Sequence, residues 1–222
     1  NFALLLNSDT VVTPRWVDQM VACADSNPKN GLIGPLSNCA TWQSIPEIIA
    51  KGEWAENPLP EHVSVQQMGE WVAAQSTRLY PEMQFLNGFC LLIRRAVIEQ
   101  IGYFDEENFG VGYGEENDYC LRAKKQGWRL ALADDTYIYH AHSRSYSSER
   151  RRKLSDRANR SLAKKHGQQI IDQGTADCRE NRVLQGIRAH SKHIMPREEI
   201  IQKARERFKD RRVVFVLPIW AA

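Results

Sequence analysis

The sequence predicts an α/β domain followed by a helical C-terminal segment, and three observations support this fold class. Short apolar runs typical of buried strands end in polar loops, as at residues 2–6. Stretches with apolar residues at helical spacing lie between these runs and are bounded by capping residues and glycines. The 222 residues, of which 42% are hydrophobic, can form one sizeable domain with an appendage.

The predicted elements alternate along the first part of the chain. Thr13 and Pro14 indicate the N-cap and first position of the first helix, and Gly127 indicates the end of a later one. Residues 41–82 show no clear period and are expected to be irregular. The expected strands are 2–6, 32–38 (running into a loop), 83–93, 128–133 and 136–140, and the expected helices are 16–24, 95–101 and 115–126.

Charge divides the chain into an acidic body and a basic tail. Residues 1–142 hold 10 Lys+Arg against 18 Asp+Glu, a net of −8, and residues 143–222 hold 20 against 9, a net of +11. A basic tail can bind nucleic acid or an anionic membrane, but the aromatic residues on which bases stack are nearly missing there. We therefore expect a solvated, basic helical linker at 147–210. Its expected interruptions are Gly167, Gly174 and Pro196.

The cysteines and the two ends of the sequence indicate where the protein is located and whether the sequence is part of a longer one. Five dispersed cysteines without a C-x-x-C pair indicate reduced thiols in a cytosolic protein, not a disulfide framework or a zinc site. No apolar run reaches the ~20 residues that span a bilayer. We expect a cytoplasmic location, with the inner face of the membrane as the alternative. Because strand-like runs stand at both ends, at 2–6 and 213–222, we expect a fragment of a longer protein.

Three carboxylates crowd together behind a glycine-rich turn, where a helix is predicted to begin. Glu115 and Asp118 share one face of that helix, and Glu116 points about 100° away. Such a cluster repels itself unless a metal, a cation or a catalytic task compensates. An ionised carboxylate in a cleft can act as a general base. The alternative is that acids in a first turn complement the helix dipole, which explains one or two of the three.

Two polar loops carry further candidate ligands. Asp9 follows the strand 2–6, at the kind of sheet edge where a carboxylate can hold a divalent cation that bridges a diphosphate. A simple turn is the alternative there. His140 and His142 follow a predicted strand and precede Arg144, so this loop can ligate a metal or contact phosphate. A purely structural histidine is the alternative.

In order and spacing, six motifs resemble those of family 2 glycosyltransferases with the GT-A fold. They are LLLNSDT (4–10), GPLSN (34–38), FLNGFCLLIRR (85–95), IGYFDE (101–106), GYGEENDYCLRA (112–123) and IYHAHSRSY (138–146). The resemblance implies a GT-A-like, Rossmann-like partial mixed sheet with flanking helices over residues 1–146, without the N-terminal nucleotide-binding part. Residues 211–222 resemble the first strand of a GT-B domain, which suggests the start of a further α/β domain.

The resemblance also implies an activity. A family 2 enzyme of this kind moves a sugar, with inversion, from a nucleoside-diphosphate sugar to an acceptor hydroxyl in polysaccharide or glycan synthesis, and Mg²⁺ or Mn²⁺ is the implied cofactor. The implied partners are a nucleotide-sugar donor, a glycan or glycolipid acceptor and the remaining domains of a longer polypeptide, with no nucleic acid expected. Two alternatives stay open: a noncatalytic carbohydrate-binding or scaffold fragment, and a basic-tail module that binds nucleic acid or a membrane surface.

Roles are implied for the residues that match the family's motifs. Asn7 replaces the first acid of the family's D-x-D motif, so Asp9 is the implied carboxylate on the cation. Glu115 and Asp118 are expected to contact the acceptor or to fix the turn. The full set is Glu116 as catalytic base; Asp9, His140 and His142 at the metal and diphosphate; Asn7, Ser8 and Arg144 at the donor; and Asn87, Gly88, Glu115, Asp118 and Trp42 at the acceptor or transferred sugar.

Overall fold

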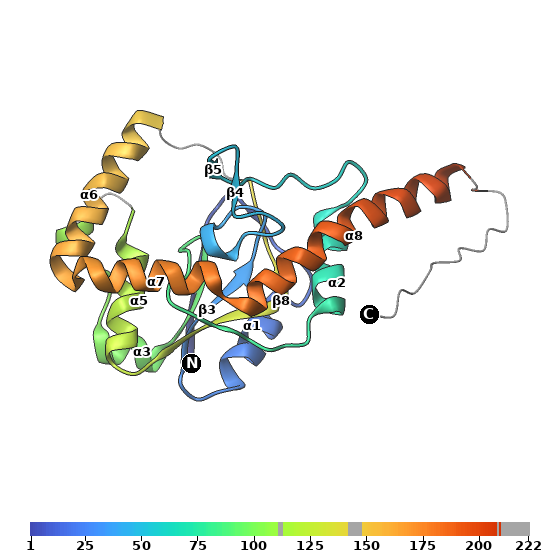
Figure 1. The fold of residues 1–222 in the computed structure, drawn as a ribbon. Helices are drawn as coiled ribbons and strands as arrows, with labels where there is room; N and C mark the ends of the chain where they lie inside the picture. Colours follow the sequence, from blue (N-terminus) through green and yellow to red (C-terminus); the bar gives the residue numbers. More distant parts are fainter. Residues whose placement is uncertain (111–112, 142–147, 208, 210–222) are drawn as a thin grey trace.

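The computed structural model describes residues 1–110, 113–141, 148–207 and 209, and it confirms the predicted α/β class (Figure 1). The described residues form a five-stranded mixed sheet in the order β1-β7-β3-β8-β6. Strands β3 and β8 pair in parallel, and the other neighbours pair antiparallel. These strands are β1 (Phe2–Leu6), β3 (Asn30–Leu36), β6 (Glu82–Met83), β7 (Cys90–Arg94) and β8 (Arg129–Tyr137).

Short ribbons and helices surround this sheet. The two ribbons pair β2 (Thr10–Val11) with β9 (Tyr139–His140) and β4 (Ile49–Ala50) with β5 (Glu53–Trp54). The described helices are α1 (Trp16–Asp25), α2 (Val65–Gln75), α3 (Arg95–Ile101), α4 (Glu106–Phe109), α5 (Glu115–Lys125), α6 (Ser148–His166), α7 (Gln168–Glu180) and α8 (Arg182–Arg207), with a 3-10 turn at Thr41–Gln43. None of them has an apolar stretch long enough to cross a membrane.

Alternation along the central strands builds a hydrophobic cluster on each face of the sheet. On β7, Cys90 and Leu92 pack in the cluster that contains residues of α1. Leu91 and Ile93, one position on, pack in a larger cluster with residues of α2 and α5. This is the period of two that a strand imposes, and it explains why a strand buried on both faces has a continuous apolar sequence.

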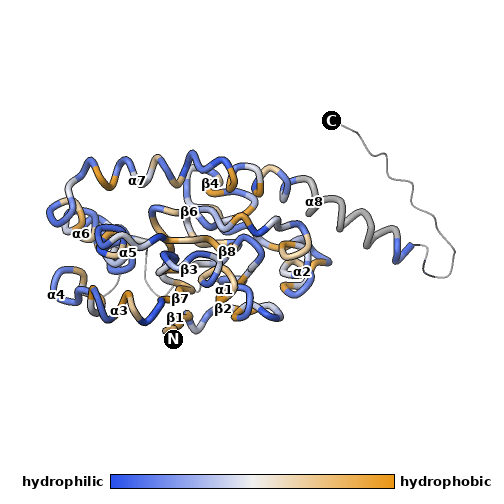
Figure 2. Tube along the Cα trace, turned by 90° about the horizontal axis from the view of Figure 1, so that it is seen from below, coloured by the Kyte–Doolittle hydropathy of each residue, from blue (hydrophilic) through white to orange (hydrophobic). Residues whose placement is uncertain are grey.

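The C-terminal helices belong to the larger cluster. Leu162 of α6, Cys178 of α7 and Leu184 of α8 are all at most 3% exposed and pack with the core. Helix α6 packs against α4, α5 and α7, and Figure 2 shows α7 along one side of the molecule, with hydrophobic and hydrophilic segments alternating. The expectation of a solvated linker is therefore wrong for these three helices.

Four expectations about local structure in the first part of the chain are also wrong. Helix α2 lies inside the stretch expected to be irregular, and the capping box of Ser64 and Gln67 starts it. The expected strand 83–93 is interrupted, because residues between β6 and β7 form a loop. Thr13 does not cap α1: its hydroxyl donates to the Tyr137 carbonyl (2.7 Å). Strand β8 runs through Asp134, where a break between two strands was expected.

The expected breaks in the C-terminal helices are correct at one glycine and wrong at two positions. Gly167 separates α6 from α7, as expected. Gly174 and Pro196 instead lie inside helices, and the second break follows α7 at Asn181. Gly174 lets α7 approach the core closely, because a Cβ there would lie 2.8 Å from the Phe85 ring. The expected strand start at 211–222 lies outside the described residues.

Candidate active site

The turn before α5 needs glycine for two reasons. Gly114 is the N-cap of α5 and has φ 90, a left-handed conformation that favours glycine. A Cβ at this position would also lie 2.9 Å from the Ala158 Cβ of α6. The turn therefore sets Glu115 and Glu116 at the first turn of α5, beside α6, as the sequence predicts for the start of this helix.

Glu116 lies in the wall of a cavity of about 790 Å³. Asn87 and Trp42 line the same cavity, so three of the predicted site residues come together. Burial raises the pKa of Glu116 to about 7, and the negative charge of Glu115 contributes to the rise. A carboxyl group with this pKa is partly ionised near neutral pH and suits general-base chemistry. The volume is in the range of ligand sites, roughly 300–1,000 Å³.

Glu115 has a different environment from its neighbour. Its Oε2 atom is buried and has no hydrogen-bond partner among the residues that the structure describes. Its charge acts on the pKa of Glu116, while no contact with a cationic side chain compensates it within the described part of the chain. Glu115 therefore tunes the proton affinity of Glu116 in this structure, and its contact with an acceptor stays a prediction.

The Glu115→Gln variant is expected to lower the pKa of Glu116 below about 7, because a neutral side chain no longer opposes ionisation of the neighbouring carboxylate. NMR titration of the Glu116 side-chain carboxyl carbon measures this directly. Glu107→Gln, which removes an exposed carboxylate of α4, is the matched control and should leave the titration unchanged. An unaltered Glu116 titration in Glu115→Gln would show that the two side chains are not coupled.

The loop between β6 and β7 reaches Glu116. The backbone N–H of Asn87 donates to Gln43 Oε1 (2.6 Å), and the Asn87 side chain accepts from the Phe89 N–H (3.0 Å). Between them, Gly88 lies against Glu116: a Cβ at Gly88 would come within 3.4 Å of the Glu116 Cβ. Gly88 therefore brings the backbone of this loop close to the candidate base, while its predicted contact with the sugar stays a prediction.

The same loop reaches the second group of predicted residues. The Phe89 ring stacks on the His140 ring with centroids 5.1 Å apart, and the Phe89 carbonyl accepts from the Asn7 N–H (2.8 Å). Asn7 and Ser8 are exposed in the turn before Asp9. One loop thus connects the Glu116 cavity with the Asp9 loop.

Asp9 and His140 face each other across the β2–β9 ribbon. His140 Nε2 lies 3.4 Å from Asp9 Oδ1, and His140 Nδ1 lies 2.9 Å from the Cys39 carbonyl oxygen. Because a carbonyl only accepts, Nδ1 donates to the Cys39 carbonyl, and Nε2 faces Asp9. Asn38 fixes this strand through both the N–H and the carbonyl of His140.

This donor set fits a divalent cation. An imidazole nitrogen oriented by a carbonyl at its other nitrogen, next to a carboxylate, is a usual arrangement at metal sites. No group of three or more His, Cys, Asp and Glu side chains that could hold a metal occurs among the described residues. Asp9 and His140 would therefore supply two ligands to a cation and leave positions for diphosphate oxygens and water. The predicted ligand His142 and the predicted donor contact Arg144 lie outside the described residues.

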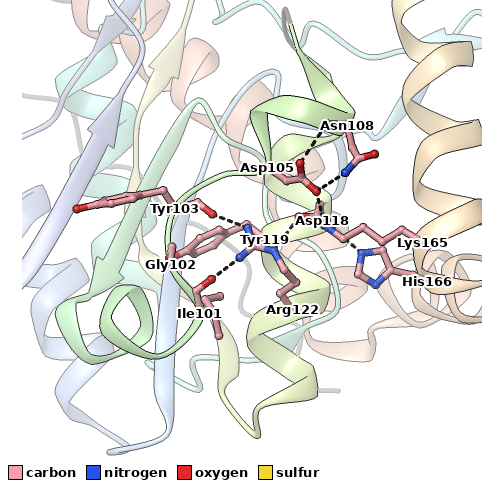
Figure 3. Close-up of polar contacts among 10 residues, drawn as sticks. All are labelled: Ile101, Gly102, Tyr103, Asp105, Asn108, Asp118, Tyr119, Arg122, Lys165 and His166. Atoms are coloured by element: carbon pink, nitrogen blue, oxygen red, sulfur yellow. Dashed lines mark hydrogen bonds and ion pairs between the residues drawn. The ribbon is translucent and has the colours of Figure 1, made fainter.

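Asp118 has a structural role (Figure 3). It is fully buried, and its Oδ2 pairs with Arg122 Nε (2.8 Å). Its Oδ1 pairs with Lys165 Nζ and His166 Nε2, both at 2.7 Å, and Lys165 also reaches Asp105 (2.6 Å). Burial alone raises the pKa of Asp118, but the hydrogen bonds from these three partners outweigh burial and hold the pKa below its usual range. The prediction that Asp118 contacts the acceptor is therefore wrong, because its carboxylate connects α5 to α6.

Helices α6, α7 and α8 form a wall of the cavity that was not predicted from the sequence. This wall includes Asn159, Leu162, Ile171, Thr175, Arg179, Gln185, Arg188, Ala189 and Lys192. In the same cavity, the Trp42 ring packs edge-on against Trp54 with centroids 5.1 Å apart. One signal in the sequence indicates that α7 buries one face. Ile171, Gly174 and Cys178 are three and four positions apart, so they form a stripe on one face of the helix.

Part of the chain is similar to known proteins. A family model described as glycosyltransferase-like family 2 matches residues 1–159. The chain is similar to the N-acetylglucosaminyl-diphospho-decaprenol L-rhamnosyltransferase of Mycobacterium tuberculosis, with 28% identity over 162 residues that cover 64% of the chain and 48% of the relative. It is also similar to the O-antigen biosynthesis protein RfbC of Myxococcus xanthus, with 32% identity over 150 residues that cover 64% of the chain and 11% of RfbC. The chain thus spans about half of the first relative and about a tenth of the second.

Proposed function

The chain belongs to glycosyltransferase-like family 2, and from this premise we propose that the protein transfers a sugar from a nucleoside-diphosphate donor to an acceptor hydroxyl in glycan synthesis. The observation that carries the proposal is the position of Glu116. This carboxyl group has a pKa of about 7 and lies in the wall of a cavity large enough for a sugar acceptor.

Glu116 acts as the general base in this proposal. Its ionised carboxylate accepts the proton of the acceptor hydroxyl as that oxygen attacks the anomeric carbon of the donor. The bond from the anomeric carbon to the diphosphate breaks as the new glycosidic bond forms, so attack from the opposite side inverts the configuration. The backbone of Gly88 packs against Glu116, since a Cβ at this position would lie 3.4 Å from the Glu116 Cβ.

Asp9 and His140 are the residues that would hold Mg²⁺ or Mn²⁺. They present a carboxylate oxygen and an imidazole nitrogen 3.4 Å apart, from the turn before β2 and from β9. The chemistry supplied by a divalent cation there is neutralisation of the charge on the leaving diphosphate. Phe89 stacks on His140, and Asn38 and Cys39 accept from it, so the protein fixes the orientation of this ring.

The proposed acceptor is a sugar carried on a lipid diphosphate. The printed name of the mycobacterial relative includes an N-acetylglucosaminyl-diphospho-decaprenol, which supports this class by analogy. The cavity also has apolar side chains for a substrate with an apolar part, among them Ile48, Ile49 and Trp54. These residues belong to or adjoin the β4–β5 ribbon, where Ile49 and Trp54 are half exposed.

A panel of nucleotide sugars tests the proposal. The full-length protein is incubated with each donor, with Mn²⁺ or Mg²⁺ and with a sugar diphosphate acceptor, and both nucleoside diphosphate release and glycoside product are measured. We expect one donor to give both products in equal amounts, with inverted configuration at the anomeric carbon. Absence of transfer from every donor would contradict the proposed function, and retention of configuration would contradict the role of Glu116.

Asp9→Asn is expected to weaken Mn²⁺ binding in the presence of nucleoside diphosphate by at least ~10-fold, because an amide oxygen replaces an anionic ligand. Isothermal titration calorimetry measures this affinity without turnover. Asp18→Asn removes an exposed carboxylate of α1 and serves as the control. Equal Mn²⁺ affinity in the Asp9 variant and the wild type would remove Asp9 from the proposed site.

A further inference from the structure

Arg188 of α8 is a buried cation without a carboxylate partner. Its side chain is only 7% exposed, yet none of the ion pairs between described residues includes it. Its Nε donates to the Ser44 carbonyl (3.1 Å), and its Nη2 donates to the Trp42 carbonyl. Both acceptors are neutral, so they satisfy hydrogen bonds but do not balance the charge.

The charge of Arg188 lies in the wall of the Glu116 cavity. Burial lowers the pKa of Arg188 to about 10, and Glu47 opposes this shift. The Glu47 carboxylate, however, pairs with Lys192 Nζ at 2.6 Å. An uncompensated guanidinium at a cavity wall favours an anionic ligand, because the ligand's charge supplies the balance that the protein lacks.

Arg179 of α7 is a second cation in the same wall. Its guanidinium carbon lies 6.0 Å from the centroid of the Trp42 ring, whose backbone carbonyl accepts from Arg188. Within the described part of the chain no carboxylate lies at ion-pair distance from it. Two arginines from successive helices therefore converge on Trp42, and arginine forks match the geometry of phosphate oxygens.

We propose that Arg179 and Arg188 form an anion subsite that binds the phosphate or diphosphate group of the acceptor. The inference rests on the proposed function, because it assigns the cavity to the acceptor. It adds a division of labour within the cavity: Glu116 of α5 receives the hydroxyl proton, and the C-terminal helices hold the charged group. The donor's diphosphate instead belongs at Asp9 and His140.

Direct titration tests the subsite without turnover. Inorganic pyrophosphate is titrated into the full-length protein by calorimetry in EDTA, so that no divalent cation bridges it to Asp9. We expect Arg179→Gln and Arg188→Lys to bind pyrophosphate about ten-fold more weakly than the wild type, the loss expected for a charge-assisted hydrogen bond. Lysine is chosen at position 188 because it keeps the positive charge, which a neutral replacement would remove at the risk of breaking the fold. Arg182→Gln, which removes an exposed arginine of α8, is the matched control. No measurable binding to the wild type, or equal affinity in all four proteins, overturns the subsite.

Kinetics then identify the source of the anion. Pyrophosphate should compete with the acceptor, and competition with the nucleotide sugar alone overturns the assignment. Arg179→Gln should raise the KM for a sugar 1-diphosphate about ten-fold and leave the KM for the methyl glycoside of the same sugar unchanged. Equal effects on both acceptors also overturn it. If the wild type transfers sugar to neither acceptor, the proposed function fails, while the titration still decides whether the two arginines bind a diphosphate.

Discussion

Replacing Glu116 with glutamine is expected to lower kcat by about 10³-fold, since general-base catalysis contributes roughly 10²–10⁴-fold and glutamine cannot accept the proton. The binding of the nucleotide sugar should stay nearly unchanged, because Glu116 lies in the proposed acceptor cavity and the proposed donor ligands are Asp9 and His140. Steady-state kinetics and donor titration by calorimetry separate the two effects. Near-normal turnover in Glu116→Gln would remove Glu116 as the base.

The pH dependence gives an independent signature of the same group. Because only ionised Glu116 accepts a proton, kcat/KM of the wild type should rise with pH through about 7, the value to which burial and Glu115 raise its pKa. The residual kcat/KM of Glu116→Gln should not show this rise with pH. A wild-type profile that is flat between pH 6 and pH 8 would contradict the assigned pKa (about 7).

Stability measurements show whether Glu116→Gln acts through chemistry or through the fold. The folded-state pKa of Glu116 is raised above its unfolded value, so this carboxyl destabilises the fold at pH values above the unfolded pKa. Glutamine carries no charge to bury. The free energy of unfolding of Glu116→Gln at pH 8 should therefore equal or exceed that of the wild type. A less stable variant would mean that lost activity reflects a damaged fold.

Asp118→Asn is expected to lower the free energy of unfolding at pH 7 by about 3 kcal/mol, because breaking a buried ion pair leaves uncompensated cations. Asp118 is fully buried and pairs with Arg122, Lys165 and His166. Urea unfolding followed by circular dichroism measures the change. The control is Glu149→Gln, which breaks an exposed pair with Lys153 and should cost less than ~1 kcal/mol.

The loss in Asp118→Asn should depend on pH in a defined direction. The pKa of Asp118 is held below its usual range, so its contribution to stability is present above the unfolded pKa and is lost as pH falls through the folded pKa. The difference between wild type and variant should therefore be largest near neutral pH and shrink at acidic pH. A difference that does not change with pH would show that packing, and not charge, accounts for the loss.

The candidate base was predictable because its signals are local. A glycine turn followed by Glu115 and Glu116 at the start of a helix can be recognised from adjacent residues, and Gly114 has the left-handed backbone that such a turn needs. The strand pattern of β7 is also local, since its alternate residues pack on the two faces of the sheet. The capping box at Ser64 was an equally local signal, but the prolines around it concealed the helix that it starts.

The role of Asp118 could not be predicted from its neighbours in the sequence. Its position beside Glu115 and Glu116 suggested a shared role at the acceptor, yet two of its partners come from α6, more than forty positions along the chain. Whether a carboxylate in this cluster faces a cavity or pairs with side chains of another helix depends on which element covers that face of α5. The spacing of the residues on α5 alone does not contain this information.

The sequence by itself determined the α/β class, the order of the motifs around Asp9, Glu116 and His140, and the family. Only the tertiary structure decided that the basic C-terminal helices are part of the core and form one wall of the cavity. The physical reason is that charge composition describes a whole segment, whereas burial depends on single faces of its helices. Arg188 is buried because α8 places it against the Trp42 and Ser44 carbonyls, contacts that span more than 140 positions of the chain.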